Sequence, residues 1–358
     1  MSAYGTGTGR ALAAVMERVA VTAEAVGPRF PLYADPDDGR WTTTGRGSWT
    51  GGFWAGLLRL RARYTGDEAD RRAAVVCTAR LTPWAAADTA TRGLILWYGT
   101  APADDDAEAA ALRARAARAL LSAHDRELGL VPWGGALGGP RLLARVDGVP
   151  GTVPLLAGAG PLGVAAAAAH LRHHLDLCLG AEPATLRPAL RFEPGAGWQP
   201  CADPPPGWSR GRAWLLLAVA DALLRPDLAA AASPARLDEA VELLLGQDGF
   251  LVPAADAARP DGPLDTSAAA ITAVALLKLA RVPGPRAASC AERAEAILGR
   301  LVVSHLSGEG SGRPPGMLLD GCYDAGKGLA VRHELVWGDF FLALGLAALH
   351  GIVDITQV

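Results

Sequence analysis

The sequence predicts an all-α protein in which about twelve helices form six hairpins around a toroid. Apolar residues recur at positions i, i+3, i+4 and i+7 along most of the chain, whereas alternating strand patterns are scarce. Nearly apolar segments (94–97, 215–224 and 271–279) also alternate with amphipathic ones, as expected for an inner and an outer ring of helices. With 358 residues, half of them hydrophobic, we expect one large closed domain over 1–358.

Gly, Pro and capping residues mark where each helix starts and stops. The expected helical ranges, in chain order, are 10–26, 49–65, 67–82, 88–100, 104–124, 148–158, 161–179, 208–224, 234–247, 265–280, 286–305 and 335–350. The residues expected to cap free N–H groups are Ser48, Asp67, Asp104, Ser209, Ser233 and Asp265. Gly and Pro gather in long loops at 126–152, 180–207, 248–264 and 307–332, and such loops on a rigid scaffold tend to carry functional sites.

Charge and composition narrow the class of partner. The net charge is -3, from 34 basic and 37 acidic residues without long runs of one sign, which argues against nucleic acid or an anionic membrane as the partner. The N-terminal segment has no pattern of a secretion signal, and the apolar window 153–171 is split by Pro161, so we expect a cytoplasmic protein without a membrane span. The expected partner is a small molecule, and no oligomeric state is predicted.

No metal or cofactor is expected. The five cysteines are odd in number and form no CxxC pair, so neither a disulfide framework nor a zinc site is indicated. His170, His173 and His174 have a spacing that suits a metal, but they read more simply as the polar face and end of an outer helix. Motifs for nucleotide binding or for a serine hydrolase are lacking as well.

Four separated stretches carry a family resemblance. They are SWTGGFWAGLLRLRARYTGD (48–67), GWSRGRAW (207–214), LDTSAAAITAVALLKL (264–279) and LLDGCYDAGKGLAVRHELVWGDFFLALGLAAL (318–349). In order and spacing they resemble glycoside hydrolase family 88, the unsaturated glucuronyl hydrolases, and family 105, the unsaturated rhamnogalacturonyl hydrolases. The resemblance implies an (α/α)6 barrel and hydration of the C4=C5 double bond of an unsaturated uronic acid. An aspartic acid then protonates the enol ether and helps water to add, and no metal is required.

Asp147 is the candidate for this acid, because the mechanism needs a carboxyl group that is protonated at working pH. It lies in ARVDGVPGTVPLL (144–156), which resembles the family 105 stretch that carries the general acid and base. Its aliphatic neighbours favour the neutral acid. The alternative interpretation is a loop aspartate that caps the helix expected from 148.

The second carboxylate departs from the family pattern. The His-Asp-x-Gly-Phe motif of family 88 falls on Ala90-Thr91-Arg92-Gly93-Leu94, which has no aspartate. The spacing of family 105 falls on Asp88, which is therefore the candidate partner, or an ordinary N-cap of the helix expected at 88–100. A histidine that the families carry after the seventh helix is replaced here by Arg187 or Arg191, which predicts a pocket of different shape or more basic character.

The substrate-binding candidates pair aromatic rings with a guanidinium, which suit the C–H faces and the carboxylate of a uronic acid. Arg210 and Trp214 are four residues apart on one helix face, next to Trp208. By the resemblance, Gln199 and Trp133 line the site too.

Trp54 and Tyr323 complete the set of binding candidates, and Trp49 and Trp337 are considered alongside Trp54. For each tryptophan the alternative is packing within the inner ring. Three functions stay open: a hydrolase for an unsaturated uronyl saccharide; a family member that acts on another enol ether or polyene, such as a glycoside or polyketide of natural-product biosynthesis; and a sugar-binding pseudoenzyme.

Overall fold

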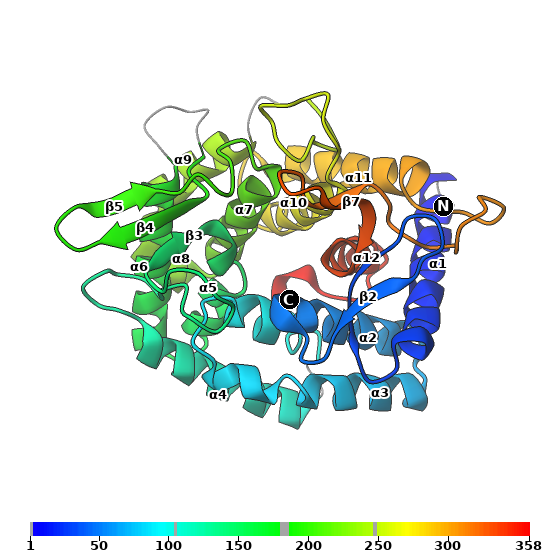
Figure 1. Ribbon diagram of the computed structural model, residues 1–358, viewed down its shortest axis with the longest axis horizontal. Coiled ribbons are helices and arrows are strands. Elements are labelled where there is room, and N and C mark those ends of the chain that lie inside the picture. Colours follow the sequence, from blue (N-terminus) through cyan, green and yellow to red (C-terminus); the bar gives the residue numbers. More distant parts are fainter. Residues whose placement is uncertain (1–2, 104–105, 180–185, 246–248) are drawn as a thin grey trace.

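Two concentric rings of helices form the molecule (Figure 1). The computed structural model describes residues 3–103, 106–179, 186–245 and 249–358. Within them, the inner ring closes on itself, because neighbouring elements contact each other in chain order and the last contacts the first. Its members are α2 (Gly51–Thr65), η3 (Gly93–Trp97), α5 (Thr152–Ala157), α7 (Ser209–Leu223), α10 (Thr266–Leu279) and α12 (Val336–Leu349).

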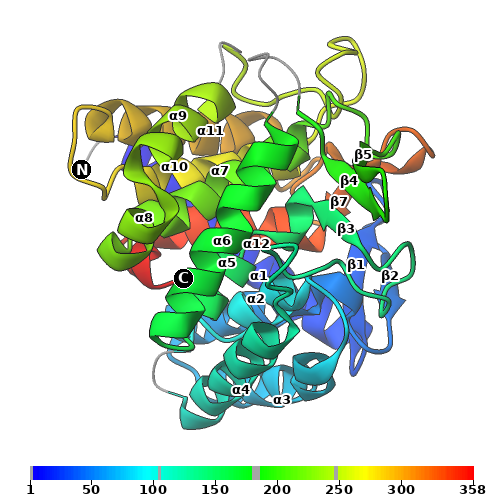
Figure 2. The same cartoon turned by 90° about the vertical axis from the view of Figure 1, so that its left-hand side faces the viewer.

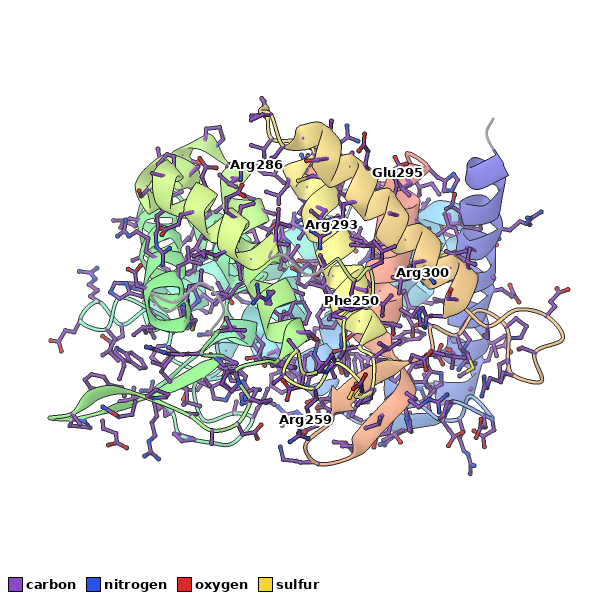
Figure 3. The ribbon with its side chains drawn as sticks, turned by 90° about the horizontal axis from the view of Figure 1, so that it is seen from above. Phe250, Arg259, Arg286, Arg293, Glu295 and Arg300 are labelled. Carbon is purple, nitrogen blue, oxygen red and sulfur yellow. The ribbon has the colours of Figure 1, made fainter. Side chains whose placement is uncertain are left out.

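The outer ring alternates with the inner ring along the chain. Its members are α1 (Ala3–Val26), α3 (Glu68–Ala79), α4 (Ala107–Ala123), α6 (Pro161–Cys178), the pair α8 (Pro226–Ala232) and α9 (Pro234–Leu245), and α11 (Ala287–Ser304). Figure 3 shows Arg286 at the N-cap of α11 and Arg293 and Arg300 along this helix. Alternation of an outer and an inner helix is the (α/α)6 architecture, so the predicted fold class is confirmed.

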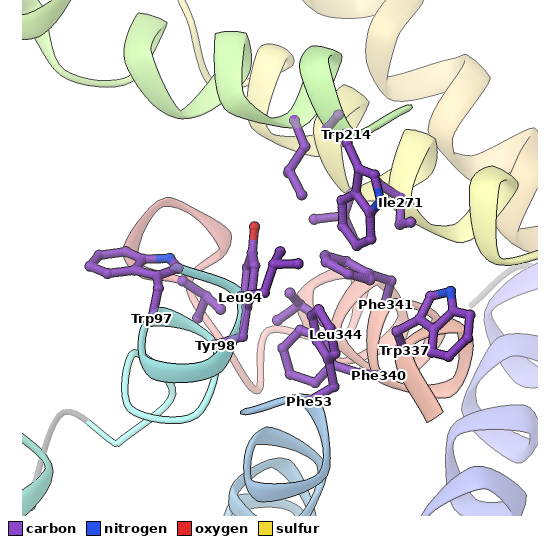
Figure 4. Close-up of a cluster of buried hydrophobic side chains, with 14 of the residues drawn as sticks. Phe53, Leu94, Trp97, Tyr98, Trp214, Ile271, Trp337, Phe340, Phe341 and Leu344 are labelled. Carbon is purple, nitrogen blue, oxygen red and sulfur yellow. The ribbon is translucent and has the colours of Figure 1, made fainter. Parts of the chain in front are cut away.

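The core lies where the inner helices meet. Phe53 of α2, Trp214 of α7 and Phe341 of α12 are all buried, with the Phe53 and Trp214 rings stacked at 6.2 Å and the Trp214 and Phe341 rings edge to face at 5.5 Å (Figure 4). Although α10 and α12 are buried almost throughout, no helix in the described parts of the chain combines the length and the hydrophobicity that a membrane span needs.

Short strands gather at one end of the barrel, which we call the loop end (Figure 2). One sheet has the order β2-β1-β7-β6 and a second the order β3-β4-β5, and every pairing is antiparallel. The strands are β1 (Phe30–Ala34), β2 (Trp41–Thr44), β3 (Leu143–Arg145), β4 (Ala189–Glu193), β5 (Gly197–Pro200), β6 (Gly321–Asp324) and β7 (Leu329–Leu335). The inner helices α5, α7 and α12 follow β3, β5 and β7, so these helices begin at the loop end.

Three features depart from the expected elements. The helix expected at 88–100 is reduced to a single π-helical stretch, Gly93–Trp97, where Gly93 packs so closely on Thr152 that a Cβ would lie 2.1 Å from its backbone nitrogen. Helix α8 and the seven strands were not expected, because each is too short to show a clear period. The remaining helices lie within a few residues of their expected ranges, except that α1 starts earlier, at Ala3.

The caps agree only in part with expectation. Asp67 and Asp265 accept hydrogen bonds from N–H groups of α3 and α10, as predicted. Ser48 and Ser209 are not caps: Gly47 precedes η1 (Ser48–Thr50), and Ser209 donates its hydroxyl to the Ala255 carbonyl instead.

The last two expected caps are Asp104 and Ser233. Asp104 is outside the described residues, and Asp106 caps α4. Ser233, with a φ of 70°, ends α8. The other short helices are η2 (Thr82–Ala86), η4 (Val146–Gly148) and η5 (Ile355–Gln357).

A buried ion pair joins two inner helices. Lys278 of α10 donates to the carboxylate of Asp221 on α7, and both side chains are at least 96% buried. Burial raises the pKa of Asp221, and the Lys278 charge opposes the shift. Each partner therefore holds the other in a place where a lone charge would be costly.

Replacing one partner of this pair should be destabilising. We expect Lys278→Met to lower the free energy of unfolding by about 3 kcal/mol or more, because the Asp221 carboxylate then loses its counter-charge. The double variant Lys278→Met/Asp221→Leu should regain much of that loss. Chemical denaturation measures it, with Lys327→Met as control, since the chain's other lysine is 64% exposed. Equal stability of Lys278→Met and Lys327→Met would contradict the prediction.

Candidate functional site

Asp147 lies at the loop end, in the short helix η4 between strand β3 and inner helix α5. Its side chain is 16% exposed, and its Oδ1 accepts a hydrogen bond from Arg145 Nε at 2.8 Å. Among the described residues, this is the one hydrogen-bonded or ion-paired partner of Asp147. The expected alternative, a cap of the next helix, is not what is observed, because Gly151 precedes α5.

His170 of outer helix α6 supports the turn that carries Asp147. Its Nδ1 accepts the Val131 N–H at 3.1 Å, so Nε2 carries the proton and donates to the Gly148 carbonyl at 3.3 Å. Burial lowers the pKa of His170 well below its usual value, which keeps the ring neutral. The neutral ring therefore holds the backbone carbonyl of the residue that follows Asp147.

Arg145 is held between two indole rings. Its guanidinium carbon lies 5.1 Å from the centre of the Trp133 ring and 5.8 Å from that of Trp208. Burial alone would lower the pKa of Arg145, but the charge and hydrogen bond of Asp147 outweigh it and raise that pKa. The guanidinium therefore contacts two indole rings and one carboxylate, while the side chain stays 26% exposed.

Arg210 continues the same arrangement on the other side of Trp208. Its guanidinium carbon lies 5.2 Å from the Trp208 ring and 5.4 Å from the Trp337 ring. Trp133, Arg145, Trp208, Arg210 and Trp337 therefore alternate indole and guanidinium across the loop end, and we call them the Arg–Trp stack. It joins segments that lie more than 200 residues apart in the sequence.

The contacts of Arg210 are internal. Nη1 donates to Asp265 Oδ2 and to the Cys322 carbonyl, each at 2.5 Å, and Nη2 donates to the Tyr323 carbonyl at 2.7 Å. The side chain is only 4% exposed. Arg210 therefore connects α7, α10 and β6, and its carboxylate partner belongs to the protein.

Tyr323 and Trp49 extend the aromatic surface beyond Trp337. Trp49 Nε1 donates to the Tyr323 hydroxyl at 3.1 Å, and the Trp49 ring lies 4.8 Å from the Trp337 ring. The Tyr323 ring lies 5.2 Å from Trp337. Of the expected binding residues, Trp133, Trp208 and Tyr323 are thus brought to one region and are partly exposed.

Three other binding candidates lie elsewhere. Trp214 and Trp54 are 1% and 4% exposed and belong to the hydrophobic core. Gln199 is exposed on β5, where its amide donates to the Ala196 carbonyl in the turn of its own hairpin. Gln199 pairs in register with Arg191, and Arg191 forms an ion pair with Glu193 at the surface.

Asp88 has different hydrogen-bond partners from Asp147. Its Oδ2 accepts from the Gly135 N–H at 3.1 Å and from Arg141 Nε at 3.0 Å, and the side chain is 50% exposed. The small burial would raise the pKa of Asp88, but these two donors outweigh it and lower that pKa. Each of the two expected catalytic carboxylates therefore has its own arginine.

Thr91 occupies the position of the missing family aspartate. It is buried, and its hydroxyl lies 2.8 Å from that of Thr89. The segment lies against the Asp147 turn, because a Cβ on Gly148 would be 3.0 Å from the Ala90 side chain. The segment that carries this neutral hydroxyl pair thus lies against the turn that carries the candidate acid.

The three histidines of α6 do not converge on a common point. His170 and His174 are buried, and burial lowers the pKa of His174 to about 4. His173 Nδ1 and His174 Nδ1 each face a backbone carbonyl one helical turn earlier. Among the described residues, no group of three or more His, Cys, Asp or Glu side chains is arranged to hold a metal ion.

Sequence reasoning did not assign Arg145 or His170 to this region. Arg145 ends β3 two positions before Asp147, a short spacing that was visible in the sequence ARVD. The contact of His170 with Gly148 spans 22 residues and depends on how α6 packs. No local pattern could have shown it.

Removing the Arg210 side chain should affect folding as well as any binding. We expect Arg210→Gln to lower the free energy of unfolding by about 3–5 kcal/mol, because Asp265 is left buried without its counter-charge. Thermal and urea unfolding measure it. Arg212→Gln is the control on the same helix and should cost less, since Arg212 donates to a backbone carbonyl of Leu243. An Arg210→Gln protein as stable as the wild type would contradict a supporting role.

Solved structures of unsaturated glucuronyl hydrolases resemble this chain. The enzyme from Bacillus sp. GL1 is 23% identical, with a TM-score of 0.80 over 96% of each chain. The enzyme from Streptococcus agalactiae is 17% identical, with a TM-score of 0.82 over 99% of this chain and 94% of that one. A mutant of the latter in complex with dGlcA-GalNAc6S is 16% identical, with a TM-score of 0.75 over 98% and 93%.

Comparison with protein-family models finds no match to the sequence, and comparison with curated proteins finds none. The structural likeness, at identities below 25%, concerns the course of the chain. The chain therefore has the (α/α)6-barrel fold of the unsaturated glucuronyl hydrolases, the family that its sequence motifs resemble.

Proposed function

We propose that the protein hydrates the C4=C5 enol ether of an unsaturated uronyl sugar, with Asp147 as general acid and base. One observation carries the proposal: Asp147 lies at the start of an inner helix, beside a guanidinium between two partly exposed indoles. Indoles suit the C–H faces of a sugar, and a guanidinium suits its carboxylate. These groups together match a uronic acid better than a neutral sugar.

The reaction needs one proton transfer in each direction. Protonated Asp147 gives its proton to C4 of the enol ether, and a water molecule adds through its oxygen to C5. The second proton of that water returns to Asp147, so the acid is restored. The hemiketal formed at C5 then opens and releases the aglycone.

The supporting groups have distinct tasks in this scheme. His170 holds the Gly148 peptide, and with it the direction of the Asp147 side chain. Arg210 holds Trp208 and Trp337 in place from inside the protein. The solved relatives support the substrate class, since one mutant structure is a complex with dGlcA-GalNAc6S.

A second candidate function is binding of the same sugar without turnover. It is favoured by Thr91, which places a hydroxyl where the resembling family has an aspartate. It is also favoured by the Arg145 ion pair, because the guanidinium already engages the candidate acid before any substrate binds.

Loss of the Asp147 proton should abolish turnover. We expect Asp147→Asn to lower kcat by about 100-fold to 10,000-fold, the range typical of a general acid and base. The measurement follows loss of the near-ultraviolet absorbance of an unsaturated uronyl disaccharide. Asp88→Asn is the matched control and should keep most activity, because Asp88 is engaged by Arg141. If Asp147→Asn retains full activity, the assignment of the acid is wrong.

Measurements of disaccharide binding and of disaccharide conversion distinguish the two candidate functions. Under the hydrolase proposal, the wild-type protein converts the disaccharide, and the product lacks the enol-ether absorbance. A protein that binds the disaccharide by calorimetry but leaves its absorbance unchanged over hours would instead have the second function.

A further inference from the structure

The loop end contains two guanidiniums in the Arg–Trp stack, and they differ in what they can still bind. Arg210 uses both Nη1 and Nη2 on acceptors of the protein, including the carboxylate of Asp265. With 4% exposure it offers no free edge to an anion. Arg210 is therefore the poorer receptor for a substrate carboxylate, although its sequence motif had suggested that task.

Arg145 has the opposite properties. It uses Nε on Asp147, and within the described part of the chain neither Nη1 nor Nη2 has a hydrogen-bond acceptor. The guanidinium lies against the rings of Trp133 and Trp208, and the side chain stays 26% exposed. A planar carboxylate that approaches in the plane of the guanidinium can accept two parallel N–H bonds.

We propose that Arg145 is the receptor for the substrate carboxylate and that the substrate thereby shares the Arg145 guanidinium with Asp147. This inference rests on the proposed function for its second half, the effect on Asp147. Once Arg145 binds the uronate, Asp147 shares its counter-charge with a second carboxylate close by. Like charges at such range favour proton uptake by one of them, and Asp147 takes that proton from solvent.

Sharing of Arg145 favours the acid form of Asp147 when a carboxylate-bearing substrate is bound. In the free protein the Asp147 carboxyl accepts the hydrogen bond of Arg145 Nε. In the complex, the substrate's own carboxylate supplies the like charge that a second aspartate would otherwise supply. This fits the buried hydroxyls of Thr89 and Thr91 beside the Asp147 turn.

Binding and turnover of matched ligands test the two halves separately. Calorimetry with D-glucuronate, glucose and sodium sulfate uses wild type, Arg145→Gln, Arg145→Lys and Asp147→Asn. We expect wild type to prefer glucuronate over glucose, and Arg145→Gln to lose about tenfold or more in glucuronate affinity without change for glucose. Arg145→Lys should recover part of it, as a point charge without the planar edge. Asp147→Asn should bind glucuronate more tightly than wild type, because a competitor for Arg145 is gone.

A control variant removes a different positive charge, and three results would contradict the inference. Arg141→Gln removes one positive charge from the same end of the protein, where Arg141 pairs with Asp88, and should leave glucuronate affinity unchanged. Thermal unfolding of each variant establishes that it is folded. Absence of glucuronate binding to wild type, sulfate binding as strong as glucuronate, or equal affinity of Arg145→Gln would each overturn the inference.

Turnover of the unsaturated disaccharide separates this inference from the proposed function. If wild type turns the disaccharide over and Arg145→Gln raises KM by about tenfold or more, both stand. If wild type turns it over and Arg145→Gln has an unchanged KM, the function stands and the inference fails. If glucuronate binding depends on Arg145 but the disaccharide is never converted, the receptor stands and the proposed function fails.

Discussion

The buried ion pair between Arg210 and Asp265 is the interaction on which the loop end depends. Asp265 caps α10, and the same Arg210 guanidinium binds the backbone carbonyls of Cys322 and Tyr323 on β6. Because that guanidinium also lies between Trp208 and Trp337, it sets the positions of two indoles at once. A charge buried this deeply is tolerated only with its partner and hydrogen bonds in place. The stack, and through Trp208 also Arg145, is therefore built outward from this pair.

Support and chemistry are thus divided between two similar groups. Arg210 donates to several protein acceptors and holds the aromatic surface, whereas Arg145 contacts the candidate acid and, among the described residues, has no acceptor for Nη1 or Nη2. The same residue type has two roles because burial and the number of nearby acceptors differ. Asp88 and Asp147 show the same division. Asp88 is exposed and bound by Arg141 and a backbone N–H, and Asp147 lies in the stack region beside Arg145.

Much of the fold could be predicted, because burial repeats with the helical period. Helices such as α7, α10 and α12 are long enough for that period to be visible. The capping residues Asp67 and Asp265 mark the starts of α3 and α10. The prediction of a helix at 88–100 was wrong, because close packing of Gly93 on Thr152 decides the path of this segment. No local pattern encodes a contact across 59 positions. The short strands were not predicted for the same reason, because β1 pairs with β7 across some 300 residues.

The sequence by itself determined the class of the fold, the order of its hairpins and the motif residues around which a site could be sought, because these depend on periodicity and on residues near one another in the chain. Only the tertiary structure decided which of those residues face outward. It placed Trp214 in the core and Arg210 on Asp265, and it set Arg145 between Trp133 and Trp208. The physical reason is that the use of a charged or aromatic side chain depends on which partners surround it, and those partners come from helices far apart in the sequence.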